Sequence, residues 1–177
     1  MKYLILIFIP VWFGCGEDQE VTKPKETVKD WSMGHSVDYN QEVSAREELD
    51  IKIYLEHHKG LKMTTSNSTL RHQIIRSKLQ NRKSADEGDL VHVKVKISLL
   101  NGAVCYESDS IPDQFVIGKS DVASTGLQEG IQLMYESDKA KFIVPSGLAY
   151  GLLGDESLNI PPQAVLIYDV ELITVEK

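Results

Sequence analysis

Residues 90–107, LVHVKVKISLLNGAVCYE, contain the pattern that decides the fold. From residue 91 to residue 97, valine or isoleucine occupies every second position, and histidine or lysine occupies the positions between them. This alternation predicts a strand that buries one face and exposes the other. Asn101-Gly102 follows and predicts a tight hairpin, because both residue types tolerate positive φ. Residues 104–107 are then expected to form the returning antiparallel strand.

Further apolar runs predict the rest of one antiparallel sheet. These strands are expected at residues 70–75, 114–117, 141–144 and 165–175. Residues 125–128, TGLQ, have the spacing of a capping box, and Leu127, Ile131 and Met134 then share one face of a short helix. About six strands around one short helix make an α+β fold.

A longer helix is expected before the sheet, over residues 41–60. Ser44 and Glu47 have the capping-box spacing of a helix start. Apolar residues then recur at helical spacing from Ile51 to Leu55, and a glycine closes the run. Because only one face is apolar, this helix is expected to pack on the domain that follows.

The N-terminus has the pattern of an export signal. Lys2 precedes an apolar run over residues 3–13, and Gly14-Cys15-Gly16 follows it. The placement of Cys15 resembles a bacterial lipobox, in which the cysteine is lipidated and becomes the first residue of the mature protein. The sequence therefore predicts a signal peptide at residues 1–14 and a lipid anchor on Cys15, since two acyl chains bind a bilayer stably. The expected location is the outer membrane of a Gram-negative bacterium, on its periplasmic side or at the cell surface; secretion without a lipid is the alternative.

Residues 15–40 are expected to form a flexible acidic tether, a disordered lipoprotein stalk. Between residues 16 and 39, six acidic residues accompany three lysines and one proline, with almost no apolar periodicity. Such a segment buries too little apolar surface to offset the entropy of ordering the chain. The composition then changes, and residues 61–177 are assigned to one folded domain.

The overall composition excludes several kinds of function. The 177 residues carry a formal charge of −7, 42% are hydrophobic and 25% are charged. An acidic chain without a block of lysine and arginine has no electrostatic site for nucleic acid. The five histidines lack the spacing of a metal site, and two cysteines cannot form a disulfide scaffold. We therefore expect no nucleic acid, no metal and no cofactor as partners.

Conventional catalytic motifs are not found in the sequence. Gly147, Gly151 and Gly154 follow a predicted strand but lack the Gly-Lys-Ser/Thr ending of a phosphate-binding loop. Asp169 and Glu171 fall on the solvent side of the last strand, which indicates a solvated surface rather than an acid/base pair. No Ser/His/Asp arrangement can be argued.

Several separate motifs in the second half of the chain resemble those of FKBP-type peptidyl-prolyl cis-trans isomerases. They are FVIG at 115–118, GLQEG at 126–130, AYG at 149–151, NIPPQA at 159–164 and IYDVEL at 167–172. The resemblance implies that residues 61–177 form the family's bent antiparallel sheet wrapped around a short helix, in agreement with the strands counted above. With the lipobox, the stalk and the preceding helix, the whole chain resembles the gliding-motility-associated FKBP lipoproteins.

The resemblance also implies a set of site residues. The catalytic set comprises Tyr106, Glu107, Tyr150, Ile160 and Tyr168. The substrate-binding set comprises Phe115, Ala123, Ser124 and Leu127. The Tyr150 hydroxyl is expected to bond a substrate carbonyl, while Leu127 replaces the tryptophan at the pocket floor. Val95 stands where the family has a tyrosine, which implies a smaller and less aromatic pocket.

Prolyl isomerisation needs no nucleophile or metal. Amide resonance opposes rotation about a peptide bond with a barrier of about 18–20 kcal/mol, and an apolar pocket favours the twisted, less dipolar imide. The first hypothesis is thus an isomerase that binds X–Pro in polypeptides and assists the folding of exported proteins. The alternative is a weakly active or inactive binding module of the same fold in a cell-surface assembly of the motility type.

Overall fold

The computed structural model describes residues 33–119 and 123–177. The expected signal peptide and the lipidation site Cys15 lie outside these residues. The elements, in chain order, are α1 (Met33–His57), β1 (Thr64–Thr65), β2 (Arg71–Ile75), β3 (Leu90–Leu99), β4 (Val104–Glu107), β5 (Asp113–Val116), α2 (Thr125–Gln132), β6 (Lys139–Val144), the 3₁₀ turn η1 (Ser146–Leu148) and β7 (Leu166–Glu176).

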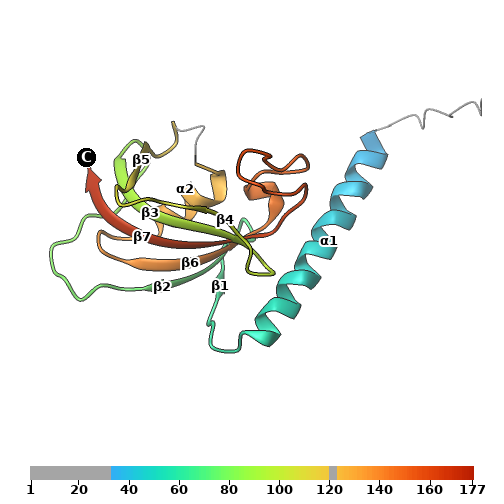
Figure 1. The fold of residues 1–177 in the computed structure, drawn as a ribbon, viewed down its shortest axis with the longest axis horizontal. Coiled ribbons are helices and arrows are strands. Elements are labelled where there is room, and N and C mark those ends of the chain that lie inside the picture. The colour runs from blue at the N-terminus through green and yellow to red at the C-terminus, as the bar shows by residue number, and fades with distance from the viewer. Residues whose placement is uncertain (1–32, 120–122) are drawn as a thin grey trace, which may run out of the picture.

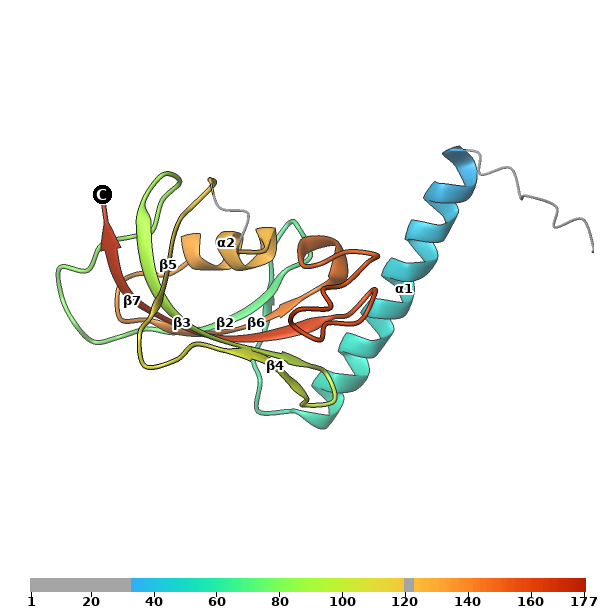
Figure 2. The same cartoon turned by 45° about the horizontal axis from the view of Figure 1, so that its top comes forward.

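The strands form one bent antiparallel sheet. Its order is β1-β2-β6-β7-β3-β4, and β5 pairs with β3 beyond this path. The sheet curves around α2, which lies on its inner face (Figures 1 and 2). The α+β prediction of a bent sheet around a short helix is therefore confirmed, with a two-residue β1 in addition to the predicted strands.

The alternating stretch forms β3, as the sequence predicts. Its apolar positions, from Val91 to Ile97, are at most 5% exposed and belong to the main core. Asn101 and Gly102 make the hairpin turn: the Asn101 side chain accepts from the N–H of Ala103 at 2.9 Å, and Gly102 has a φ of +88°. A bulge between Ile97 and Ser98 shifts the β3–β4 register.

The short helix α2 packs closely on the sheet. Leu127 and Ile131 are buried against it. A Cβ at Gly130 would lie 2.6 Å from the Phe142 ring, so only glycine allows this approach. The N-cap is Ser124, whose hydroxyl accepts from the N–H of Leu127. The capping box predicted to start at Thr125 is therefore wrong by one residue.

The helix α1 starts earlier than the sequence predicted. It spans 25 residues from Met33, so the tether expected through residue 40 is helical over its last residues. Ser44 therefore lies inside the helix and is not its cap. Extending a helix that has already formed costs far less free energy than starting a new one, so the helix can continue through Ser44 to residue 33. No helix within residues 33–119 and 123–177 is both long and apolar enough to cross a membrane.

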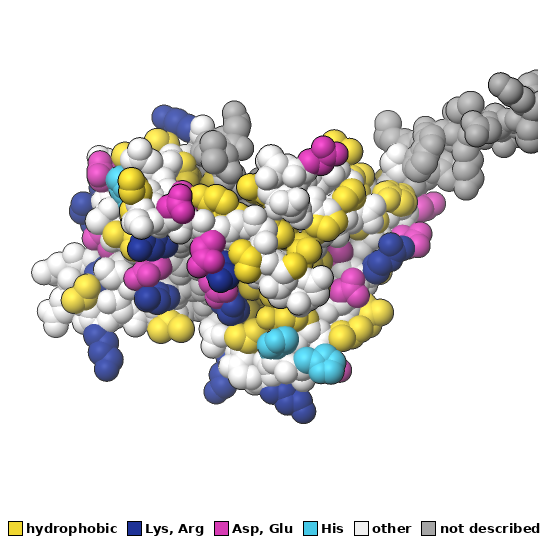
Figure 3. All heavy atoms as spheres, in the orientation of Figure 1, with side chains coloured by type: hydrophobic (Ala, Val, Ile, Leu, Met, Phe, Trp, Pro, Cys, Tyr) yellow, Lys and Arg dark blue, Asp and Glu magenta, His cyan; other side chains and the backbone are white. Residues whose placement is uncertain are grey.

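The second half of α1 packs on the domain, as expected from its apolar face. Ile51 is 1% exposed and lies in a small cluster with Ile143 and Val165. The start of the helix extends away from the sheet (Figure 1), but Val43 is buried and Tyr39 contacts Gln163 in the loop before β7. On the face shown in Figure 3, side chains of both charge signs are interspersed, without a patch of one sign.

Candidate functional site

A pocket of about 230 Å³ opens on the inner side of the sheet, between the sheet and the start of α2. Strands β3, β4, β5 and β7 contribute to it, together with the loop after η1. Its lining residues are Val95, Ile97, Tyr106, Asp113, Gln114, Phe115, Ala123, Ser124, Leu127, Tyr150, Leu158 and Tyr168. Asp113 is the only charged residue among them, so the walls are aromatic and aliphatic with a few polar groups.

Most of the predicted site residues come together in this pocket. They are Tyr106, Phe115, Ala123, Ser124, Leu127, Tyr150 and Tyr168. Val95 also lines it and is 4% exposed, so an aliphatic wall stands where the family has a tyrosine. The sequence motifs that carried the resemblance thus converge on one cavity.

The hydroxyl groups of two tyrosines meet at one wall of the pocket. Tyr168 is fully buried, and its hydroxyl lies 3.0 Å from the Ser124 hydroxyl. Tyr150 interacts with the same Tyr168 hydroxyl. Burial raises the pKa of Tyr168 well above its usual range, and burial followed by the Asp155 charge raises the pKa of Tyr150. Both hydroxyls are therefore neutral and able to donate at neutral pH.

A second polar cluster holds a carboxylate at the pocket. The Tyr106 hydroxyl donates to Asp113 Oδ1 at 2.8 Å, and the Ser108 hydroxyl donates to Asp113 Oδ2 at 2.6 Å. The Val95 N–H donates to Ser108 Oγ at 2.8 Å, which ties the cluster to β3. Burial and the bond to Asp113 raise the pKa of Tyr106. The sequence reasoning missed Asp113, although it lies two residues before Phe115 and so shares its strand face.

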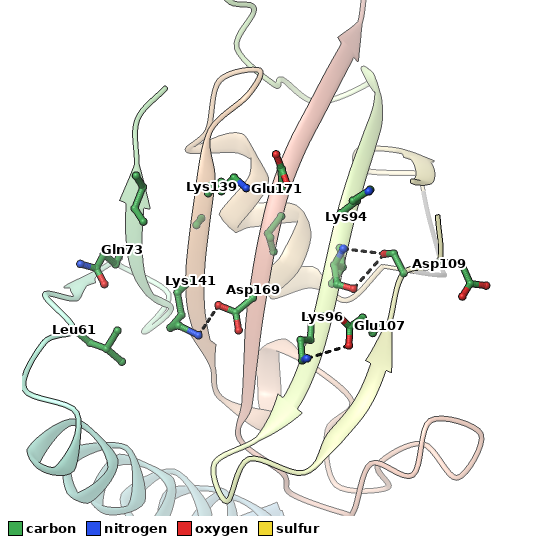
Figure 4. Close-up of a pocket in the computed structure, with 15 residues that line it drawn as sticks. Leu61, Gln73, Lys94, Lys96, Glu107, Asp109, Lys139, Lys141, Asp169 and Glu171 are labelled. Atoms are coloured by element: carbon green, nitrogen blue, oxygen red, sulfur yellow. Dashed lines mark hydrogen bonds and ion pairs between the residues drawn. The ribbon is translucent and has the colours of Figure 1, made fainter. Parts of the chain in front are cut away.

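Glu107 does not belong to this pocket. Successive side chains in a strand point to opposite faces, so Glu107 faces outward where Tyr106 faces inward. Its carboxylate pairs with Lys96 at 3.0 Å on the outer face (Figure 4). The structure therefore places Glu107 outside the pocket where Tyr106 lies, and Asp113 is the carboxylate among the residues that line it.

Ile160 is buried in the core at 3% exposure but does not line the pocket. Its backbone exchanges two hydrogen bonds with Asp155, at 2.8 and 2.9 Å, which close the loop between them. Gly154 fits under this closure because a Cβ there would lie 2.3 Å from the Ile160 carbonyl oxygen. The closed loop presents Leu158 to the pocket in place of Ile160.

A larger groove of about 580 Å³ runs along the outer face of the same sheet. Charged side chains form pairs across its strands, including Lys139 with Glu171 and Lys141 with Asp169 (Figure 4). Each of the two acidic residues is thus partnered by a lysine on a solvated surface. Among residues 33–119 and 123–177, no aromatic side chain lines this groove, so the inner pocket is the candidate site.

The family model described as FKBP-type peptidyl-prolyl cis-trans isomerase matches residues 81–173. The chain belongs to the FKBP family. The matched segment includes all strands and loops that line the inner pocket of this FKBP chain.

Individual relatives agree with this assignment. A probable FKBP-type peptidyl-prolyl cis-trans isomerase of Haemophilus influenzae is 30% identical over 167 residues, which cover 90% of this chain and 65% of the relative. The isomerase FkpA of Aeromonas hydrophila is 54% identical over 52 residues, covering 29% of this chain and 19% of FkpA. The chain thus spans less than two thirds of the length of either relative.

The fold also matches solved FKBP structures. The crystal structure of FkpA from Escherichia coli aligns with a TM-score of 0.60 and 25% identity, over 80% of this chain and 64% of that one. This agreement confirms the FKBP-like fold.

Proposed function

We propose that this chain is a peptidyl-prolyl cis-trans isomerase whose site is the inner pocket. The observation that carries the proposal is the convergence of Tyr106, Phe115, Leu127, Tyr150 and Tyr168 on one cavity in a chain of the FKBP family. Clefts of this kind, mostly apolar with a few directed polar groups, are typical binding sites for small segments of a ligand.

The apolar walls would lower the barrier to rotation. In the planar ground state, resonance separates charge across the imide, and this separation decreases as the bond twists. A pocket walled by Phe115, Leu127 and the Tyr168 ring offers little solvation to the dipolar ground state and so favours the twisted state. A preference of about 4 kcal/mol for the twisted state would give roughly a thousandfold acceleration.

The hydroxyl groups would fix the position of the bound polypeptide relative to the pocket. Tyr150 presents a neutral hydroxyl at the pocket, and such a group can donate to a carbonyl flanking the proline. Fixing that carbonyl converts free rotation of the whole segment into rotation about one bond. The Ser124 hydroxyl would hold the Tyr168 hydroxyl in place, and Tyr168 would in turn orient the Tyr150 hydroxyl that it contacts.

We place this activity on exported proteins, at a membrane. The support is the sequence of residues 1–15, with its apolar run and lipobox-like Cys15. X–Pro isomerisation takes tens to hundreds of seconds unaided and can limit folding outside the cytoplasm. A place in a surface assembly of the gliding-motility type rests on the resemblance of the whole chain alone. Incorporation of labelled palmitate that is lost in Cys15→Ser tests the anchor.

The activity is tested by exchange NMR on an X–Pro peptide. The full chain, purified in detergent, is expected to raise the cis–trans exchange rate above that of buffer with detergent. Tyr150→Phe is expected to lower kcat/KM several-fold, with the fold intact. A folded wild-type chain that leaves the exchange rate unchanged would contradict the isomerase and favour a binding module of the same fold.

A further inference from the structure

The segment that carries Tyr150 is bonded to α1 as well as to the sheet. This segment, residues 145–165, connects β6 to β7. Both ribbon views place it beside the middle of α1 (Figures 1 and 2). The pocket residue Tyr150 thus lies in a loop that is hydrogen-bonded to a helix outside the matched family segment.

The main contact is a buried carboxylate. Glu47 is 7% exposed, and Ser146, the first residue of η1, is 4% exposed. The Ser146 N–H donates to Glu47 Oε2 at 3.2 Å, and the Ser146 hydroxyl donates to Glu47 Oε1. Because a buried carboxylate is costly without hydrogen bonds, these donors fix where α1 docks.

Ser146 in turn holds both neighbours of Tyr150. Its carbonyl accepts from the N–H of Ala149 at 2.9 Å and from the N–H of Gly151 at 2.8 Å. A displacement of Ser146 is therefore transmitted to the backbone on each side of Tyr150.

A second contact from α1 reaches the same loop from its other end. The Gln163 side-chain amide donates to the Tyr39 hydroxyl, and the Gln163 N–H donates to the Gly151 carbonyl at 3.0 Å. Gly151 is thus bonded both to Ser146 and to Gln163, and each of these residues is bonded to α1.

We propose that Glu47 is a positioning residue for the prolyl site, acting through Ser146 on the Tyr150 hydroxyl. This inference rests on the proposed function and makes α1 one of the elements that determine the rate of prolyl isomerisation. Small misplacements of a positioning group are costly: about 1 Å can lower a rate by about a hundredfold. A partial release of one loop anchor is expected to have a smaller effect.

Two neighbouring glutamates of α1 provide a matched test. Glu48 pairs with Arg71 on β2, away from the Tyr150 loop, so Glu48→Ala removes a docking contact without touching Ser146. Glu47→Ala is expected to lower kcat/KM about threefold, since misplacing the Tyr150 hydroxyl cannot cost more than removing it, with Glu47→Gln in between because it keeps one acceptor oxygen. Glu48→Ala is expected to change kcat/KM less than twofold. Equal losses in the two alanine variants, or no loss in Glu47→Ala, would overturn the proposal.

A double-mutant cycle tests the route through Tyr150. If Glu47 acts by placing that hydroxyl, Glu47→Ala has no further effect on kcat/KM in a Tyr150→Phe background. Losses that simply add would show that Glu47 acts elsewhere. If Glu47→Ala does not fold, Glu47→Gln carries the same cycle.

A readout independent of catalysis separates this inference from the proposed function. In ¹⁵N spectra, Glu47→Ala is expected to shift the Ala149 and Gly151 amide signals, whereas Glu48→Ala leaves them in place. A wild-type chain without isomerase activity would remove the proposed function, yet these shifts would still report the coupling. Unmoved Ala149 and Gly151 signals in Glu47→Ala would remove the coupling itself.

Discussion

The two faces of the sheet carry opposite chemistry on the same strands. Tyr106 and Tyr168 face the inner pocket, while their chain neighbours Glu107 and Asp169 pair with lysines outside. The inner face holds rings, neutral hydroxyls and the Asp113 carboxylate to which two of those hydroxyls donate, and the outer face holds ion pairs in water. One residue along a strand therefore separates a group in the candidate site from a group on a solvated surface.

This difference makes each outer residue a control for its inner neighbour. A substitution inside should affect stability or catalysis strongly, whereas a substitution one position away should have a much smaller effect.

The largest contrast is expected at β7. Tyr168→Ala leaves a cavity in the core and should lower the free energy of unfolding by about 3–5 kcal/mol. Asp169→Asn breaks a half-exposed ion pair and should cost at most about 1 kcal/mol. Urea unfolding of both variants measures the two values; similar losses would contradict the assignment of faces.

The next contrast concerns catalysis at β4. Tyr106→Phe removes the hydroxyl that donates to Asp113, leaving a carboxylate short of one donor in the pocket. We expect kcat/KM for an X–Pro peptide to fall about tenfold, the equivalent of about 1.4 kcal/mol. Glu107→Gln should leave kcat/KM within twofold of wild type. A loss in Glu107→Gln that exceeded the loss in Tyr106→Phe would restore Glu107 to the site.

A smaller contrast concerns the start of α2. Ser124→Ala removes the N-cap and the contact with Tyr168, and should destabilise the chain by about 1 kcal/mol. Thr125→Ala alters an exposed residue of the first turn and should change stability by less than about 0.5 kcal/mol. Thermal unfolding of both variants distinguishes the cap observed here from the one that the TGLQ motif predicted.

The mildest effect is expected from high pH. The pKa values of Tyr106, Tyr150 and Tyr168 are raised in the folded chain. Above about pH 10, these hydroxyls therefore keep their protons in the folded state but lose them in the unfolded state. Stability is therefore fully present below that pH and falls as the pH rises above it. Urea midpoints from pH 8 to pH 11 should show the decline, and Tyr168→Phe should reduce its slope; an equal slope would contradict the raised pKa of Tyr168.

Local sequence patterns predicted much of the fold. The alternation over residues 91–97 and the Asn101-Gly102 turn are decided by neighbouring residues, and the structure has β3 and its hairpin there. The start of α1 was not predictable in this way. Residues 33–40 have no apolar periodicity, and the helix there is an extension of a docked helix with a contact from Tyr39 to Gln163.

The site residues that lie in sequence motifs were predicted correctly as lining the pocket. Those that reach the pocket only through contacts between distant parts of the chain were missed. Tyr150 and Tyr168 come from motifs of fixed spacing and do line the pocket. Leu158 replaces Ile160 because two backbone bonds to Asp155 fold the loop inward, which no spacing reveals. Asp113 reaches the pocket only because β5 pairs with β3. Glu107, in contrast, could have been excluded from strand alternation alone.

The most direct test of the central claim is to find which face of the sheet holds the proline. Intermolecular NOEs are measured between the ring protons of an X–Pro peptide and the methyl groups of the chain. We predict contacts to Leu127 and Leu158, which line the inner pocket. Contacts instead to Leu61 and Ile75, which line the outer groove, would contradict the account.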